Sequence, residues 1–180
     1  QDNADFNTLK EQSVKRQKVY STSENKVFRF ENSPDEKNCF IINAVVLNND
    51  FLKGEVNEAI VDDVVGHCLG TNGIVKVATA IQDFYINKGF ITTRISLPSQ
   101  NIKSGILILD VDAGLIDKVI VESNNVNGWV FPFHSDDILN VRDLEQGLEN
   151  LQQVPNISEN IKIEPAQKKG YSNILIDVDR

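Results

Sequence analysis

Histidine and cysteine, the residue types that build most metal and catalytic sites, are scarce in this chain. It has two histidines, His67 and His134, and two cysteines, Cys39 and Cys68. A site that used His67 and Cys68 would still lack two of the four ligands that a structural zinc ion normally takes. The sequence also has no phosphate loop, no nucleophile elbow and no histidine pair at catalytic spacing. We therefore expect no metal and no cofactor.

Acidic pairs offer the remaining argument for an enzyme. Asp62 with Asp63, or Asp110 with Asp112, could suggest acid–base or metal chemistry. No nucleophile elbow, phosphate loop or histidine pair accompanies them, and Asp112 recurs as Asp179 at a matching strand end, which indicates a position required by the fold. The prediction is that the protein is not an enzyme.

An excess of basic residues and a long apolar run are also missing. The chain has 18 Lys and Arg against 26 Asp and Glu, a formal net charge of −8. Binding to nucleic acid depends on clustered basic residues that release counterions, so the composition argues against nucleic acid and against anionic membrane surfaces. No apolar run reaches the length that spans a bilayer, and the N-terminus lacks a signal-peptide pattern. A mature exported fragment would have such a sequence.

The two cysteines leave two readings open. If Cys39 opens a strand and Cys68 ends a helix packed on it, a disulfide would stabilise that unit by roughly 3 to 4 kcal/mol. A disulfide would also place the protein in an oxidising compartment. The other reading is two buried free thiols.

An ungapped internal repeat relates Val77–Asp112 to Leu144–Asp179, sixty-seven residues later. The shift carries Val77, Ile81 and Phe84 onto Leu144, Leu148 and Leu151, Pro98 onto Pro165, and ILILDVD (Ile106–Asp112) onto NILIDVD (Asn173–Asp179). Self-similarity at a fixed period is typical of arrayed units, so the repeat predicts a duplicated helix–strand–strand module. Arrays of small α/β units usually bind extended partners rather than catalyse.

Hydrophobic periodicity predicts the elements of the first unit, which follow a polar helix and linker over residues 1–37. They are a strand at Phe40–Leu47, helices at Val56–Cys68 and Ile74–Lys88, and strands at Phe90–Leu97 and Ile106–Val111.

The second unit repeats this order in reduced form. Its expected elements are a strand at Leu115–Glu122, a turn or short helix within Asn124–Ile138, a helix at Val141–Gln153, and strands near Ile157–Glu164 and Ile174–Asp179. Both units therefore read β-α-α-β-β, an α+β fold in which helices cover one face of a three-stranded mixed sheet. We place the two domains at residues 38–113 and 114–180.

The alternating segment Phe90–Leu97 is the best candidate for an exposed edge strand. Edge strands present unpaired backbone groups, which proteins either protect or use to add a partner's strand. Alternation alone shows only a half-buried strand, so a used edge and a merely solvated one are equally good readings of the pattern.

Several strings resemble the paired periplasmic POTRA domains of two-partner secretion (TpsB-type) transporters, which export haemolysins, adhesins and contact-dependent inhibition toxins. They are CFII (39–42), GFITTRISLPSQ (89–100), GIL (105–107) and LNVRDLEQGL (139–148). The resemblance covers residues 38–180, and the strings GFITTR and RDLEQGL carry most of it. In that family a β-barrel follows the POTRA pair within the full-length chain, which implies the periplasmic portion of an outer-membrane protein.

The resemblance implies a receptor role. The pair would bind the N-terminal secretion domain of an unfolded TpsA-type exoprotein and pass it to the barrel, and a monomer is expected. Strand addition suits this capture, so we predict that the partner contacts Ile91, Thr92, Thr93, Arg94, Ile95 and Leu97, beside the Ile74–Lys88 helix. The alternative is a POTRA scaffold of the outer-membrane barrel assembly machinery, whose sequences are not expected to carry RDLEQGL or the cysteine pair.

The RDLEQGL string itself has two readings. Arg142, Asp143, Glu145 and Gln146 could orient the second domain against the barrel or touch the client. Structurally, acidic residues favour the first turn of a helix, and Arg142 with Gln146 is an ordinary i,i+4 pair. We favour the structural reading.

Overall fold

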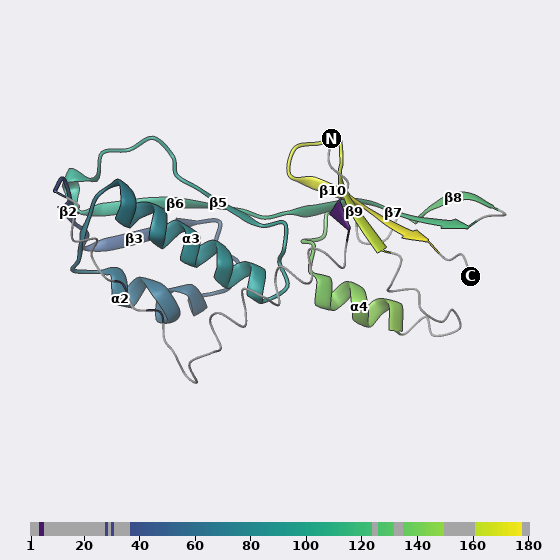
Figure 1. The fold of residues 1–180 in the computed structure, drawn as a ribbon, viewed down its shortest axis with the longest axis horizontal. Helices are drawn as coiled ribbons and strands as arrows, with labels where there is room; N and C mark the ends of the chain where they lie inside the picture. The colour runs from purple at the N-terminus through teal and green to yellow at the C-terminus, as the bar shows by residue number, and fades with distance from the viewer. Residues whose placement is uncertain are drawn as a thin grey trace. The chain divides into compact units, whose positions relative to one another are not determined.

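The chain forms two compact units, each an α+β assembly (Figure 1). The computed structural model describes residues 4–5, 28, 30, 37–123, 126–131, 135–149 and 161–177. Described residues of 20–85 and 94–112 make up the N-terminal unit. Those of 1–19, 86–93 and 113–180 make up the C-terminal unit.

The N-terminal unit is built on a three-stranded mixed sheet. Its strands are β3 (Ala44–Asn48), β6 (Ile106–Asp112) and β5 (Arg94–Ser96), in the order β3-β6-β5. The central strand β6 runs parallel to β3 and antiparallel to β5. Alternate residues Leu107, Leu109 and Val111 are buried, as the period of a strand requires.

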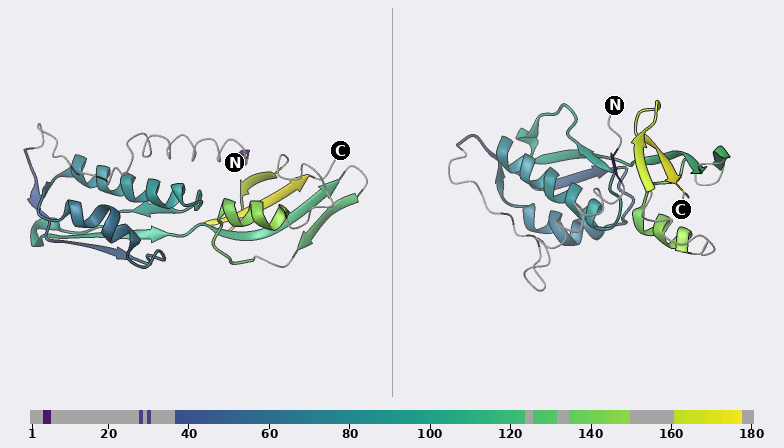
Figure 2. Two further views of the ribbon diagram at one scale, coloured as in Figure 1. Left: turned by 90° about the horizontal axis from the view of Figure 1, so that it is seen from below. Right: turned by 45° about the vertical axis from the view of Figure 1, so that its right-hand side comes forward.

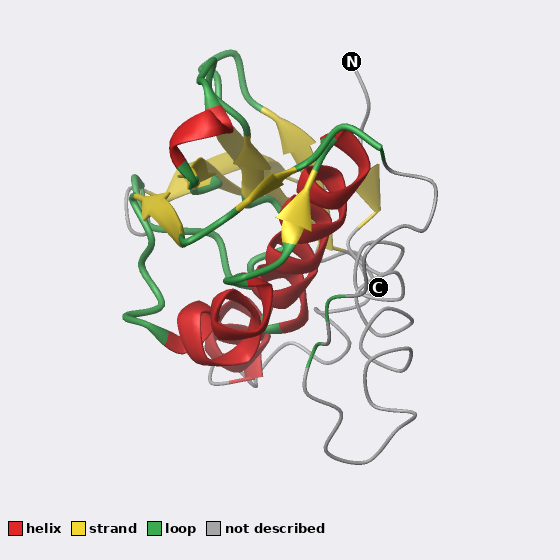
Figure 3. Cartoon of the chain, turned by 90° about the vertical axis from the view of Figure 1, so that its left-hand side faces the viewer, coloured by secondary structure: helices red, strands yellow, loops and turns green. Residues whose placement is uncertain are grey.

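Helices cover one face of this sheet, which confirms the predicted arrangement (Figure 3). They are a π-helical turn η1 (Asn57–Val61) that continues into α2 (Asp62–Val64), and the long helix α3 (Thr71–Asn87). The largest fully buried side chains of the unit are Tyr85, Ile42, Leu69, Ile81, Leu107, Leu109, Val56 and Val64.

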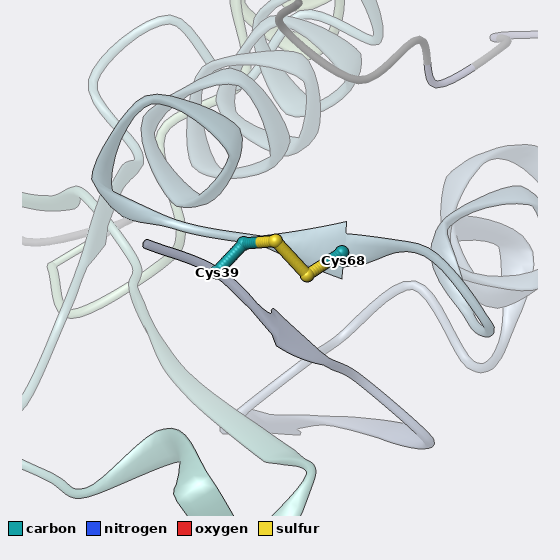
Figure 4. The surroundings of a disulfide bond; sticks show 2 residues. All are labelled: Cys39 and Cys68. Atoms are coloured by element: carbon teal, nitrogen blue, oxygen red, sulfur yellow. A yellow bond between two sulfur atoms is a disulfide. The ribbon is translucent and has the colours of Figure 1, made fainter. Parts of the chain in front are cut away.

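A short ribbon and a disulfide hold the start of this unit. Strand β2 (Phe40–Ile41) pairs antiparallel with β4 (Cys68–Leu69), and Cys39 is bonded to Cys68 with Cα atoms 5.3 Å apart (Figure 4). The disulfide reading is therefore confirmed, but Cys68 lies in a strand and not at the end of a helix. The helix stops at Val64 because Val65 is extended and Gly66 has a φ of +95°.

The predicted strand Phe40–Leu47 is broken in two. The break falls at Ile42, whose N–H donates to the His67 carbonyl at 3.0 Å, and at Asn43, whose N–H donates to the Gly105 carbonyl at 2.7 Å. These non-local acceptors divide the segment between β2 and β3.

The predicted strand Phe90–Leu97 is also shorter than expected. Strand β5 begins only at Arg94, because the preceding N–H groups of Ile91 and Thr93 bond to the nearby carbonyls of Gly89 and Phe90. Residues 90–93 therefore form a turn.

The C-terminal unit contains a five-stranded sheet in the order β1-β9-β10-β7-β8. Its strands are β1 (Ala4–Asp5), β7 (Leu115–Ser123), β8 (Val126–Phe131), β9 (Ile161–Pro165) and β10 (Tyr171–Asp177). β10 is parallel to β7, and the other pairs are antiparallel. Helix α4 (Val141–Glu149) lies against this sheet through Val141 and Leu144 (Figure 2).

Two features of the C-terminal unit differ from expectation. Residues 126–131, predicted as part of a turn or short helix, form strand β8 and pair with β7. Strand β10 begins at Tyr171, two residues before the position that the repeat indicates. An even shift keeps the same alternate side chains inside, and Ile174 and Ile176 are buried.

Candidate partner-binding edge

Strand β5 is an edge of the N-terminal sheet, and its outward backbone donor faces helix α3. Arg94, Ile95 and Ser96 lie opposite Asp112, Val111 and Asp110 of β6. In an antiparallel pair, alternate residues direct their backbone groups away from the partner strand. Ile95 is such a residue, since its N–H donates to the side-chain Oε1 of Gln82 at 3.1 Å. Among the described residues, no strand pairs with the outer side of β5.

Pro98 and Gln100 end this edge. The register of β5, carried two residues past Ser96, sets Pro98 opposite Ile108, and proline has no N–H to donate to a ladder. The Gln100 side chain bonds to the Ile108 backbone in place of Pro98. Its Oε1 accepts from the Ile108 N–H at 2.7 Å, and its Nε2 donates to the Ile108 carbonyl at 2.7 Å and to the Pro98 carbonyl at 3.0 Å.

The accessible side chains of the edge are mixed in character. Arg94 and Ser96 are exposed on the sheet face away from the helices, and Leu97, directly after the strand, is 51% exposed. Ile95 is half-buried on the opposite face. The edge therefore offers polar side chains, one apolar side chain and backbone groups to a partner.

The first three residues predicted to touch the partner lie elsewhere. Ile91 is buried in the core of the C-terminal unit, and Thr93 is buried with its Oγ1 accepting from the Gly114 N–H at 3.4 Å. A Cβ on Gly114 would collide with Thr92 Oγ1, so Thr92 is in close contact with that backbone. Partner contact by all six residues stays a prediction, but the structure brings only Arg94, Ile95 and Leu97 to the edge.

The predicted residues of α4 surround a capped helix start. Asn140 Oδ1 accepts from the N–H of Arg142 at 2.9 Å and of Asp143 at 3.4 Å, which makes Asn140 the N-cap. Arg142 Nη2 donates to the Asn87 carbonyl at 2.5 Å. Glu145 is half-buried and Gln146 is exposed. These contacts support a structural role for Arg142 and Asp143.

Sequence reasoning missed the importance of Asn140. Its Nδ2 donates to the Lys88 carbonyl at 3.2 Å, while the neighbouring Val141 N–H donates to the Gly89 carbonyl at 3.0 Å. Gly89 has a φ of +103°, and a Cβ there would lie 2.5 Å from Asn140 Oδ1. The sequence signal that could have identified Asn140 as an N-cap is its position directly before a helical pattern.

The described residues contain no group of three or more His, Cys, Asp or Glu side chains that could hold a metal ion. Over the same residues, no helix combines the length and apolarity needed to cross a membrane. The buried Tyr85 hydroxyl donates to Asp50 Oδ1. Burial is the main cause that raises the pKa of the phenol, and this hydrogen bond raises it further. This pair anchors the loop before η1 and is part of the core.

Comparison with known proteins agrees with this geometry. Residues 40–114 match the family described as "POTRA domain, ShlB-type", and residues 122–165 match the family described as "POTRA domain". The chain belongs to the POTRA family.

The relatives of this POTRA pair are outer-membrane transporters. The chain is 34% identical over 118 residues to outer membrane transporter CdiB-2 of Burkholderia pseudomallei, which covers 64% of the chain and 20% of that transporter. It is 30% identical over 143 residues to outer membrane transporter CdiB of Escherichia coli, a match that covers 77% of the chain and 24% of that transporter. The solved structure of CdiB from Acinetobacter baumannii superposes with a TM-score of 0.67 at 25% identity, over 95% of the chain and 36% of CdiB. The POTRA pair thus spans between a fifth and just over a third of the length of these transporters.

Proposed function

We propose that this POTRA pair is the periplasmic recognition module of a two-partner secretion transporter. It binds the N-terminal secretion domain of an unfolded exoprotein and delivers it to the outer-membrane β-barrel of the same full-length chain. The observation that carries the proposal is the β5 edge, where the backbone of Ile95 points outward beside α3. The kinship with CdiB transporters supports it.

Strand addition at β5 fits an unfolded client. Backbone hydrogen bonds do not depend on the client's side chains, so an extended segment of varied sequence can pair with the edge. Selectivity then comes from alternate side chains of the added strand. The exposed Leu97 offers an apolar contact at the end of the edge, and Arg94 offers a charge on the open face of the sheet.

A proline at Ile95 tests this proposal. Ile95→Pro removes the outward N–H and places a ring where the added strand would lie, while edge strands tolerate proline at such positions. Thr93→Pro would be a poor test, because Thr93 is buried and its N–H holds the preceding turn. Ile95→Ala is the matched control, since it shortens the side chain but keeps the N–H.

The measurement is the affinity of the chain and both variants for the secretion domain of the exoprotein encoded beside it. We expect the alanine variant to bind nearly as well as the unmodified chain. The proline variant should bind at least about tenfold more weakly, because a backbone bond is lost and the ring blocks the approach. Equal binding by both folded variants would exclude strand addition at β5. Absence of binding by the unmodified chain would favour a scaffold role instead.

A further inference from the structure

The Gln82 side chain of α3 already accepts the backbone N–H that an added strand would use. Gln82 Oε1 accepts the Ile95 N–H at 3.1 Å, although this N–H points away from the sheet. Gln82 is half-buried, and the fully buried Ile81 and Tyr85 on the same helix fix the rotation of α3 about its axis. The amide is therefore held at the edge by the packing of the helix.

We propose that Gln82 closes the β5 edge in the unbound protein and that a client strand must displace it. This inference rests on the proposed function, because the displacing group is the backbone carbonyl of the bound client segment. Exposed edges invite unwanted pairing, and proteins protect them with side chains or other elements. A side-chain amide gives this protection reversibly, because it offers the same kind of acceptor as a strand carbonyl.

The two glutamines at this sheet edge differ in how firmly they are held. Gln100 makes three hydrogen bonds, two of them to the backbone of Ile108 in the central strand. Within the described part of the chain, Gln82 makes one such bond, to Ile95. Gln100 thus completes the sheet where Pro98 cannot, whereas Gln82 can be displaced at the cost of a single neutral bond.

A client strand gains the Ile95 N–H only when its own carbonyl replaces the Gln82 amide. The edge available for pairing is short, because β5 ends at Ser96. Peptides that approach without an extended backbone leave Gln82 in place. Gln82 is therefore a specificity-determining residue, because a client that pairs well replaces the lost Gln82 bond with its own and a client that pairs poorly does not.

The test replaces the acceptor and keeps the length of the side chain. Gln82→Met replaces the amide oxygen with a thioether, which is a much weaker acceptor for the Ile95 N–H, and Gln82→Asn is a second variant that shortens the amide side chain by one methylene. Gln167→Met is the matched control, because it makes the same chemical change at an exposed position between β9 and β10. Two readouts are needed: hydrogen exchange of the Ile95 amide without client, and affinity for the exoprotein's secretion domain.

We expect both Gln82 variants to exchange the Ile95 amide several-fold faster than the unmodified chain. They should also bind the secretion domain about 3- to 10-fold more tightly, the range that one neutral hydrogen bond allows. The Gln167 variant should change neither quantity. If the unmodified chain binds and the Gln82 variants bind equally or more weakly, the inference is wrong while the proposed function stands. If no variant and no unmodified chain binds, both are wrong, whatever the exchange rates show.

Discussion

Reduction of the disulfide should selectively destabilise the N-terminal unit. Cys39 and Cys68 are 29 residues apart in sequence, and loop-closure entropy for a ring of that size corresponds to about 3.5 kcal/mol. Near the disulfide, strands β2 and β4 have two residues each, and Ile42 adds backbone bonds to His67 at 3.0 Å and Gly66 at 2.7 Å. Reduction leaves these native contacts in place and acts by restoring conformational entropy to the unfolded chain.

A loss of this free energy should give a clear difference in melting temperature between the oxidised and the reduced protein. For a unit of this size, 1 kcal/mol corresponds to a shift of roughly 4 to 8 °C, so reduction should lower the melting temperature of the N-terminal unit by roughly 15 to 25 °C. Hydrogen exchange during heating separates the units, since β6 reports on the N-terminal core and β10 on the C-terminal one. Exchange in β10 should be unchanged.

A double variant provides the control for this experiment. The C39S/C68S chain should melt at the reduced temperature with or without reductant. If mass spectrometry shows both thiols free and β6 melts within about 2 °C of the oxidised chain, the loop-entropy argument fails for this protein.

Three further substitutions test single contacts by urea denaturation. Asn140→Ala removes the N-cap of α4 and should cost about 1 to 2 kcal/mol, whereas Asn140→Asp, which keeps the acceptor, should cost less. Gln100→Leu leaves both backbone groups of Ile108 without their partner, which should cost about 1 to 3 kcal/mol and speed exchange of that amide. Tyr85→Phe removes the hydrogen bond to Asp50 and should cost about 2 kcal/mol. Because the pKa of Tyr85 is raised on folding, the unmodified chain should also lose stability as the pH rises above about 10, and the phenylalanine variant should lose less.

Long periodic segments were predictable from the sequence, because their burial pattern is local. Helix α3 and strand β6 lie close to their expected bounds, and so does β7. The repeat also indicated that α4 and β10 correspond to α3 and β6, apart from the two-residue offset of β10.

Other elements depend on distant partners that no local pattern reveals. The break after Ile41 follows from acceptors on His67 and Gly105, far along the chain. Strand β8 exists because β7 is long enough to pair with it, although its sequence, VNGWVF, has little alternation. Gln82 is another case, since a glutamine on a helix reads as solvated until the register of β5 is known.

The interleaved order of the two units limits how such proteins can exchange parts during evolution. Ten of the described residues form the buried C-terminal core, and two of them, Ile86 and Ile91, are encoded before the last strand of the N-terminal unit. Recombination at the predicted boundary near Ala113 would transfer the second POTRA domain without these two residues. A functional chimera between relatives must therefore carry the segment from Ile86 to Thr93 together with residues 114–180, or match it closely in sequence.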